Sequence, residues 1–307
     1  MGEARETMDQ AFADMPWADR FWTSPDGLNL HARDYPAASG PARAPVVCLH
    51  GLTRNARDFE NLAPRIAAKG RRVLALDVRG RGQSAWDAQP MRYVPAVYAG
   101  DVLALLDALG IARAVFIGTS MGGLITMTVP AFRPQAVAAA VLNDIGPEIA
   151  PEGIKRITGY TGKSAEITTW TEAADYARRL NEIAFPHYSA DQWMAFAHRL
   201  FVEKDGRPVL DYDPDIAKAF APPPLSPGQE PPPPVDLWPL FKGLAAGRPL
   251  LTIRGAISDL LSHDIAQRMR EAAPQMDYAE VNGVGHAPML DEPEALAAID
   301  TLLETAP

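Results

Sequence analysis

Continuous hydrophobic runs alternate with segments of helical periodicity along the first half of the chain. Residues 45–50 are almost continuously apolar, which is typical of a strand buried on both faces. Residues 57–69 instead place apolar side chains at the spacing of a helix. The same reasoning predicts further strands at residues 21–23, 28–35, 73–77, 114–118 and 137–143, and further helices at 96–109 and 121–132. This alternation predicts an α/β fold with a mostly parallel sheet and helices on both faces.

The alternation stops near residue 147. Residues 147–239 contain helix-like stretches at 171–183 and 190–202 but no buried strand, and they include a proline-dense segment at 221–234 that favours extended geometry. The α/β pattern then returns with strands at 250–254 and 276–281 and helices at 264–273 and 292–304. We therefore predict one core interrupted by an insertion: a first core part at 1–146, a helical cap with a proline-rich exit at 147–239, and a second core part at 240–307.

Charge and cysteine content exclude several classes of function. The 307 residues carry 29 basic and 38 acidic side chains, a net charge of −9, which disfavours nucleic-acid binding. No apolar run approaches the roughly 18 residues of a membrane span, and the first residues lack the apolar segment of a signal peptide, so we expect a cytoplasmic protein. The single cysteine, Cys48, lies on an interior strand and is expected to be inert. It allows no intramolecular disulfide, and no paired Cys/His spacing predicts a metal; we expect no cofactor.

The sharpest motif is Gly-Thr-Ser-Met-Gly-Gly at residues 118–123. It matches the G-x-S-x-G pattern of a nucleophile elbow, in which a strand turns abruptly into a helix and exposes a serine. Side chains two positions before and after that serine would clash, which explains the glycines at 118 and 122. A strand-like segment precedes the motif and a helix-like segment follows it. We predict that Ser120 is a nucleophile; the alternative is a serine in a tight strand–helix turn.

A serine hydroxyl needs an adjacent base. His286 follows a predicted strand in the loop sequence Gly-Val-Gly-His-Ala-Pro and is the predicted base, whereas His263 opens a helix. Asp259 also follows a strand and gives the chain order Ser…Asp…His, so we predict it as the acid that orients the histidine. Asp144, at the end of another strand, is the rival acid, and its alternative role is that of a turn residue or helix cap.

These residues give the chain a resemblance to the α/β-hydrolase superfamily over nearly its whole length. The resemblance rests on His-Gly-Leu-Thr-Arg-Asn at 50–55, Leu-Asp-Val-Arg-Gly-Arg-Gly-Gln-Ser at 76–84, the elbow, and the segment around His286. The chain looks closest to the capped esterases, lactonases and carbon–carbon-bond hydrolases. The resemblance implies an oxyanion hole formed by the backbone N–H groups of Leu52 and Met121, and a helical cap inserted after residue 144.

Several residues are candidate substrate contacts. Arg54 and Asn55 flank the implied oxyanion loop and could hold a polar or acidic group, although a solvated pair is the alternative. The resemblance implies that His50 helps to shape this loop, and a buried, hydrogen-bonded histidine is its other interpretation. Trp193 and Phe196 are candidate apolar walls contributed by the cap, unless they only pack the cap onto itself.

Taken together, the motifs predict a serine hydrolase that cleaves a small carboxylic ester, lactone or related carbonyl compound through Ser120, His286 and Asp259. Carbon–carbon-bond hydrolases and cofactor-free haloperoxidases of this resemblance use the same triad and remain alternatives. A non-catalytic ligand-binding receptor of the same fold is an alternative of a different class. An epoxide hydrolase or dehalogenase is expected to carry aspartate at the elbow, which Ser120 argues against.

Overall fold

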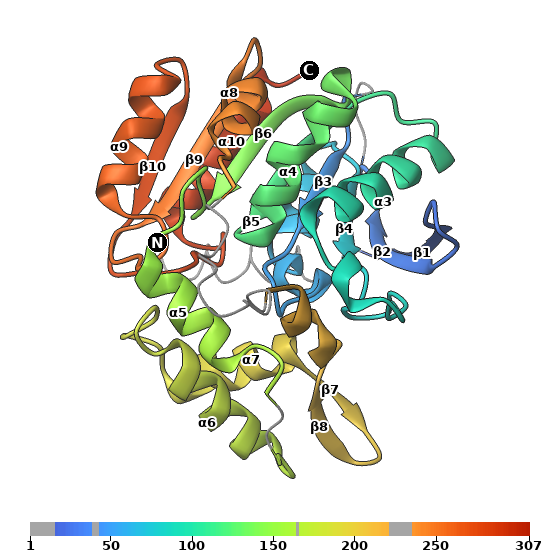
Figure 1. The fold of residues 1–307 in the computed structure, drawn as a ribbon, viewed down its shortest axis with the longest axis vertical. Helices are drawn as coiled ribbons and strands as arrows, with labels where there is room; N and C mark the ends of the chain where they lie inside the picture. Colours follow the sequence, from blue (N-terminus) through green and yellow to red (C-terminus); the bar gives the residue numbers. More distant parts are fainter. Residues whose placement is uncertain (1–15, 39–42, 164–165, 221–234) are drawn as a thin grey trace, which may run out of the picture.

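One mixed sheet of eight strands forms the centre of the computed structural model, which describes residues 16–38, 43–163, 166–220 and 235–307 (Figure 1). The strands are β1 (Ala18–Thr23), β2 (Asn29–Tyr35), β3 (Val46–Leu49), β4 (Val73–Asp77), β5 (Ala114–Thr119), β6 (Val137–Asn143), β9 (Leu250–Gly255) and β10 (Asp277–Val281). Their order across the sheet is β1-β2-β4-β3-β5-β6-β9-β10. Strand β2 pairs antiparallel with β1 and β4, and all the other pairings are parallel. The carboxyl ends of the parallel strands therefore meet at one edge of the sheet.

Helices cover both faces of this sheet. The core helices are α2 (Leu62–Ala68), α3 (Pro95–Ala108), α4 (Met121–Phe132), α8 (Trp238–Ala245), α9 (His263–Ala272) and α10 (Pro293–Thr305). In β3, Val47 and Leu49 belong to the apolar cluster under α3, α4, α8 and α9, whereas Val46 and Cys48 belong to the cluster under α2 and α10. This division follows from the two-residue period of a strand. The predicted α/β class, with helices on both faces of a mostly parallel sheet, is confirmed.

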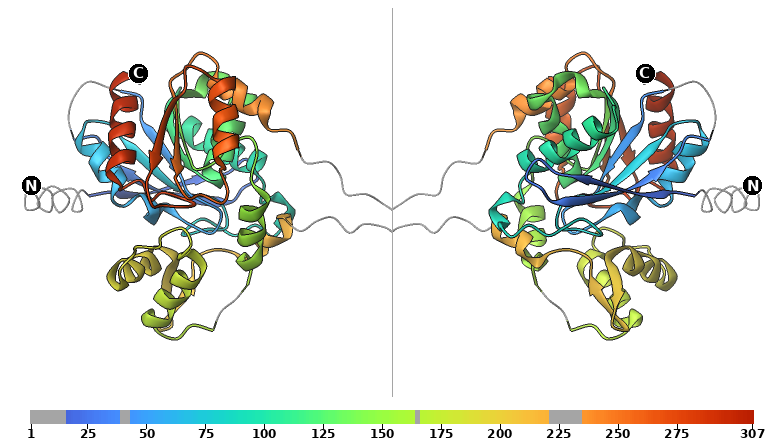
Figure 2. Two further views of the ribbon diagram at one scale, coloured as in Figure 1. Left: turned by 90° about the vertical axis from the view of Figure 1, so that its left-hand side faces the viewer. Right: turned by 90° about the vertical axis from the view of Figure 1, so that its right-hand side faces the viewer.

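The described residues between β6 and α8 lie over the edge where the parallel strands end, as the two side views of Figure 2 show. It contains α5 (Pro151–Tyr160), α6 (Trp170–Asn181), α7 (Ala190–Leu200), the strands β7 (Phe201–Lys204) and β8 (Arg207–Leu210), and the short helix η4 (Pro214–Phe220). It has its own apolar cluster. We call these elements the cap. The proline-dense segment at 221–234 lies outside the described residues.

The hairpin β7–β8 was not expected in the cap. It pairs Phe201 with Leu210 and turns at Asp205 and Gly206, which both have positive φ angles, of 51° and 73°. An Asp-Gly pair with this backbone geometry is a strong signal for a two-residue hairpin turn. The strands are only four residues long and of mixed burial, so they lack the continuous apolar run by which buried strands are identified.

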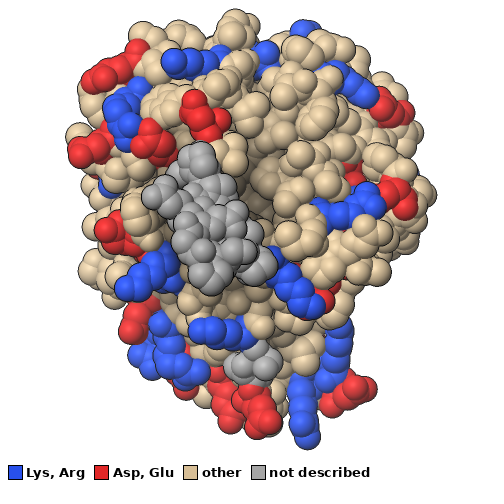
Figure 3. Space-filling view, viewed as in Figure 1, with Lys and Arg blue, Asp and Glu red and all other residues tan. Residues whose placement is uncertain are grey.

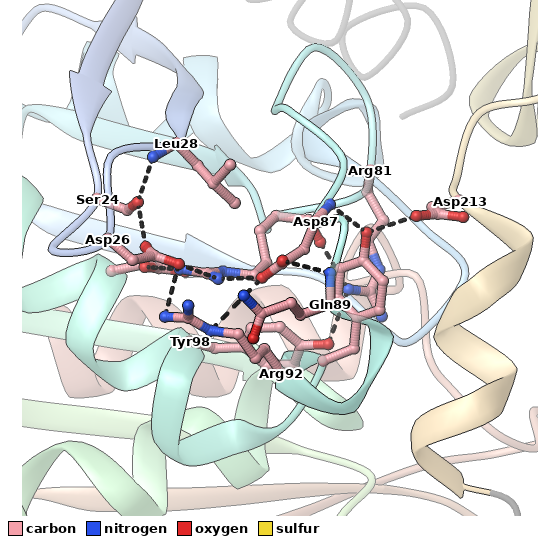
Figure 4. A network of polar contacts seen from close by, with 12 residues as sticks. Ser24, Asp26, Leu28, Arg81, Asp87, Gln89, Arg92, Tyr98 and Asp213 are labelled. Carbon is pink, nitrogen blue, oxygen red and sulfur yellow. Dashed lines mark hydrogen bonds and ion pairs between the residues drawn. The ribbon is translucent and has the colours of Figure 1, made fainter.

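A buried cluster of charges fixes the loop that follows β4. The guanidinium of Arg79 is fully buried and pairs with Asp26 at 2.9 Å and with Asp87 and Asp101 at 2.6 Å each. Arg92 adds a further contact to Asp26, and Figure 4 shows this network from close by. Because removing one partner from a buried ion pair typically costs about 3–5 kcal/mol, the network holds the loop in one arrangement.

The same loop is tied to the cap. The hydroxyl of Tyr93 donates a hydrogen bond to Asp213 at 2.6 Å, and the backbone N–H of Asp213 donates to the carbonyl of Gly80 at 2.7 Å. A side chain on Gly80 would lie 2.7 Å from the Tyr93 ring, so glycine allows this close approach. The part of the cap that directly precedes η4 is therefore fixed to the core.

The surface shows no single-sign patch on the face of Figure 3, where basic and acidic side chains are interspersed and the area over α4 is mostly uncharged. Among the described residues, the helices are all too short or too polar to cross a membrane.

Candidate active site

Ser120 lies at the sharp turn between the end of β5 and the first turn of α4. Its φ of 52° falls in a region that non-glycine residues rarely adopt. A Cβ on Gly118 would lie 2.4 Å from the carbonyl oxygen of Gly122, and a Cβ on Gly122 would lie 2.0 Å from that of Leu49. Both positions therefore require glycine, and the turn presents the Ser120 side chain at the carboxyl edge of the sheet.

His286 lies in the loop after β10, and its Nε2 is 2.9 Å from Oγ of Ser120. Asn143, the last residue of β6, fixes this loop because its amide donates to the carbonyl of Pro288 at 2.8 Å and to Oγ1 of Thr119 at 3.0 Å. The His286 side chain is only 8% exposed. Its imidazole is therefore held within reach of the serine proton.

Asp144 is the carboxylate beside His286. Its Oδ2 lies 2.7 Å from Nδ1 of His286 and also accepts from the hydroxyl of Ser258 at 2.5 Å, while its Oδ1 accepts from the N–H of Gly255 at 2.8 Å. Asp144 directly follows β6 with a φ of 54° and is fully buried. Its three donors offset the cost of burying a carboxylate and fix its orientation toward the imidazole.

Asp259, the predicted acid, does not contact His286. Both of its carboxylate oxygens accept hydrogen bonds from the guanidinium of Arg156, on the cap helix α5, at 2.6 and 2.8 Å. Burial raises the pKa of Asp259, but the hydrogen bonds and charge of Arg156 outweigh it, so the pKa is lowered. The prediction that Asp259 orients the histidine is therefore wrong, and the rival residue Asp144 occupies that position. His263 begins α9, as expected.

Among the described residues, the backbone N–H groups of Leu52 and Met121 donate no hydrogen bond to another loop, strand or helix. Met121 is the first residue of α4, and the first N–H groups of a helix have no partner within it. The fully buried Arg81 supports both residues, because its Nε donates to the carbonyl of Leu52 at 2.9 Å and its Nη2 lies 3.5 Å from Sδ of Met121. Arg81 lies in one of the motifs that carry the family resemblance, but nothing in its local pattern assigned it this role.

His50 is a structural residue and not a substrate contact. It is completely buried, its Nε2 accepts from the N–H of Val78 at 3.0 Å, and its Nδ1 lies 2.7 Å from the carbonyl of Gly51. The proton is therefore on Nδ1. Burial lowers the pKa of His50 to about 4, so the ring is neutral at pH 7. The prediction that His50 contacts the substrate is therefore wrong, and its alternative interpretation as a buried, hydrogen-bonded histidine is correct.

Asn55 and Trp193 also serve structural contacts. Asn55 caps the short helix η1 (Ala56–Phe59) and donates to the carbonyl of Arg199 in α7 at 2.9 Å, so it joins the core to the cap. Trp193 is buried in the apolar cluster of the cap. Neither residue is among the described residues that line the cavities beside Ser120, so their assignment as substrate contacts is also corrected.

Two cavities meet at Ser120, which lines both of them together with Leu52 and Ile157. The first has a volume of about 90 Å³, and we call it the His286-side cavity because His286 lines it. The second has a volume of about 630 Å³, and its described lining contains no charged side chain, so we call it the apolar cavity.

Arg54 and Phe196, two predicted substrate contacts, line the His286-side cavity. The Arg54 guanidinium forms a forked ion pair with Asp58 and lies 4.1 Å from the centre of the Phe196 ring. This stacking and pairing hold the guanidinium in one orientation. The described residues contain no group of three histidine, cysteine or acidic side chains that could hold a metal ion.

Comparison with known proteins agrees with the geometry. Residues 44–293 match the family described as "alpha/beta hydrolase fold". A 3-hydroxybutyrate-oligomer hydrolase from Cupriavidus necator is 33% identical over 282 residues, which cover 89% of this chain and 92% of that protein. The crystal structure of an alpha/beta hydrolase from Novosphingobium aromaticivorans is 48% identical, with a TM-score of 0.85 and coverage of 94% of this chain and 98% of that chain.

More distant structures share the fold alone. An E-2-(acetamidomethylene)succinate hydrolase is 22% identical, with a TM-score of 0.77 and coverage of 94% of this chain and 100% of that chain. The family match spans residues 44–293, and the similarities to the Cupriavidus and Novosphingobium proteins cover 89% and 94% of this chain. The chain therefore belongs to the alpha/beta hydrolase fold family, which confirms the resemblance found in the sequence.

Proposed function

We propose that this protein hydrolyses carboxylic esters, with Ser120 as nucleophile, His286 as general base and acid, and Asp144 as the acid that orients the histidine. The single observation that carries the proposal is the hydrogen-bonded chain from Ser120 Oγ to His286 Nε2 at 2.9 Å and from His286 Nδ1 to Asp144 Oδ2 at 2.7 Å. This is the contact pattern that an activated serine nucleophile requires.

The reaction follows from this contact pattern. Ser120 Oγ attacks the ester carbonyl while Nε2 of His286 takes its proton, and the carbonyl oxygen becomes an oxyanion. The N–H groups of Leu52 and Met121 stabilise that charge; one such donor is typically worth about 3–4 kcal/mol. His286 then gives the proton to the departing alcohol. A water molecule attacks the acyl-serine, passes its proton to His286, and the acid is released as the proton returns to Ser120.

The position of Asp144 supports the role assigned to it. Its carboxylate accepts a hydrogen bond from Nδ1 of His286, which leaves Nε2 free to accept the proton of Ser120. The N–H of Gly255 and the hydroxyl of Ser258 donate two further hydrogen bonds to the carboxylate and hold it in place beside His286. The carboxylate can therefore stabilise the imidazolium that forms during each proton transfer.

The first substrates to test are esters of short hydroxy acids. One relative of nearly the same length is named a 3-hydroxybutyrate-oligomer hydrolase, and such oligomers contain the bond that a serine esterase cleaves. Lactones and 1,3-diketones belong in the same screen because the residues at this site could also attack their carbonyl groups.

The test combines a hydrolysis screen with one substitution and its control. We expect wild-type protein to hydrolyse p-nitrophenyl butyrate and to be labelled by a fluorophosphonate probe, and we expect Ser120→Ala to lose both properties while remaining folded. Thr301→Ala, which removes an exposed hydroxyl on α10, is the matched control and should retain both. Labelling or turnover by folded Ser120→Ala at the wild-type level would overturn the proposal.

A further inference from the structure

We propose that the natural ester carries a carboxylate on its alcohol half, that Arg156 and Arg54 bind this carboxylate, and that the acyl half is apolar and occupies the apolar cavity. The proposal rests on the ester-hydrolase function proposed above and names the class of substrate. It predicts which half of the ester bears the charge.

The position of His286 distinguishes the two cavities. The histidine must give its proton to the leaving oxygen, so the alcohol half has to lie on the side of Ser120 where His286 is found. His286 lines only the smaller cavity, and the loop residues that follow it, including Pro288 and Met289, line that cavity as well. The alcohol half is therefore assigned to the His286-side cavity and the acyl half to the apolar cavity.

The His286-side cavity contains the charged groups. Arg156 and Arg54 both line it, and their side chains are 18% and 13% exposed. Each guanidinium uses Nε and Nη2 for its own carboxylate, Asp259 or Asp58. Among the described residues, no protein atom accepts a hydrogen bond from Nη1 of either arginine. A guanidinium has five N–H groups, so each retains donors for a ligand carboxylate.

Tyr160 is a third hydrogen-bond donor in the lining of the His286-side cavity. Burial raises the pKa of Tyr160 and outweighs the opposing effect of the two arginines, so the hydroxyl remains protonated and can donate at neutral pH. Two guanidinium groups and a phenol that line one cavity supply the donors that an anionic oxygen group needs.

Helix α5 presents different residues to the two cavities. Ile154 and Thr158 line only the apolar cavity, Arg156 and Tyr160 line only the His286-side cavity, and Ile157 between them lines both. Residues three or four apart share a helix face, so one face of α5 is apolar and the neighbouring face carries donors. The apolar cavity, at about 630 Å³, has room for an acyl chain of several carbons, and its described lining offers a carboxylate no cationic partner.

The main experiment compares three esters. The first is 3-(butanoyloxy)butanoate, with the charge on the alcohol half; the second is its primary amide, which is nearly isosteric and neutral; the third is monobutyl succinate, with the charge on the acyl half. We expect kcat/KM for the first to exceed that for each of the others by roughly 10- to 100-fold, as for one or two hydrogen bonds to a charged group. A preference for monobutyl succinate, or equal rates for the first and second, would overturn the proposal.

The residue assignment is tested by removing one ion pair without leaving a lone charge. In the double variant Arg156→Gln/Asp259→Asn, the preference for the carboxylate over the amide should fall at least fivefold. The matched control is Arg133→Gln/Asp107→Asn, which removes an exposed fork at the far end of α4 and should keep the wild-type ratio. A double variant at the Arg156 pair that keeps the wild-type ratio would overturn the assignment. If it does not fold, Arg156→Lys, which keeps the charge but loses the fork, is measured under the same criterion.

A binding measurement separates this inference from the proposed function. Calorimetry with the inactive Ser120→Ala protein compares the affinities of the carboxylate and the amide without turnover. Tighter binding of the carboxylate supports the inference even if the wild-type protein hydrolyses no ester, an outcome that would count against the proposed function alone. Equal affinities would overturn the inference and leave the ester-hydrolase proposal standing.

Discussion

Replacement of Asp144 by asparagine tests the triad most directly. Asparagine has the size of aspartate, but its NH₂ group cannot accept a hydrogen bond. If the NH₂ replaces Oδ1, it faces the N–H of Gly255, and two donors are left in contact. If it replaces Oδ2, it faces Nδ1 of His286, which accepts in the other tautomer, and the hydroxyl of Ser258, whose oxygen already accepts from the N–H groups of Leu260 and Leu261. The second orientation keeps the bond from the fixed N–H of Gly255 and avoids a contact between two donors there, so it should be the one adopted.

This orientation of the asparagine changes the tautomer of His286. An NH₂ beside Nδ1 of His286 requires Nδ1 to accept, so the ring proton moves to Nε2, and Nε2 can no longer accept the proton of Ser120. The corresponding substitution in a serine protease lowers kcat by about 10⁴, which corresponds to about 5.4 kcal/mol of transition-state stabilisation. We expect a similar loss here. The free energy of unfolding should fall by only about 1–3 kcal/mol, because most hydrogen bonds are retained.

The assay is hydrolysis of p-nitrophenyl butyrate by wild type, Asp144→Asn and Asp259→Asn, with urea titrations to confirm folding. Asp259→Asn is the matched control because it makes the same change in the carboxylate that pairs with Arg156. It should lower kcat for this neutral ester far less than Asp144→Asn does. The reasoning would be refuted if folded Asp144→Asn kept more than a tenth of the wild-type kcat, or if the two variants ranked in the opposite order.

Three further predictions concern the supports of the site. Gly122→Ala places a Cβ 2.0 Å from the carbonyl oxygen of Leu49, so the free energy of unfolding should fall by about 2–3 kcal/mol, and an unchanged urea midpoint would contradict this. Arg81→Lys should lower kcat about tenfold with little change in KM, because one ammonium group cannot replace both the Nε bond to the carbonyl of Leu52 and the Nη1 bonds that hold the guanidinium in place; a change in KM alone would count against this positioning role. The pKa of His31 is raised above its ordinary 6.5, because its two flanking carboxylates outweigh the effect of burial. The contribution of protonated His31 to stability should therefore be complete below about pH 6.5 and lost as pH rises through the raised pKa. The measurement is the difference in the free energy of unfolding between wild type and His31→Gln, and a difference that did not change between about pH 5 and pH 9 would refute this.

Local features of the sequence predict the sharp strand–helix turn at Ser120 because the constraint is itself local. The strand β5, the two glycines around Ser120 and the start of α4 lie within twenty residues, and each is required by the backbone turn. The loop position of His286 could also be identified, since a histidine just past a predicted strand can reach over the sheet edge. In both cases the informative residues are neighbours in the sequence.

The choice between Asp144 and Asp259 could not be made in the same way. Both follow strands, and the outcome depends on the order of strands in the sheet and on a partner distant in the chain. Strand β6 lies between β5 and β9, so Asp144 ends beside the elbow, while Asp259 lies four residues beyond β9 and pairs with Arg156, 103 residues away. The chain order Ser…Asp…His holds for both Asp144 and Asp259, so it cannot decide which of them contacts His286.

The two polar candidate contacts that proved structural, His50 and Asn55, share one property: each has a hydrogen-bond partner that is distant in the sequence. His50 accepts from the backbone 28 residues on, and Asn55 donates to the cap 144 residues on. A polar residue beside an active-site loop therefore gives little information until its long-range partners are known. Arg54 remains a predicted substrate contact because it lines the cavity and its ion pair with Asp58 uses only Nε and Nη2 of the guanidinium.

In the function proposed above, catalytic chemistry and substrate choice depend on different kinds of contact. The positions of Ser120, His286 and Asp144 are set by strand ends within the buried sheet and by backbone donors. The cap helix α5 instead presents side chains, donors on one face and apolar groups on the next, and a single substitution can change either face without altering the sheet. On this argument, related chains that keep the elbow and differ along α5 should differ in the half of the ester that carries charge, because the helix acts on the substrate only through its side chains.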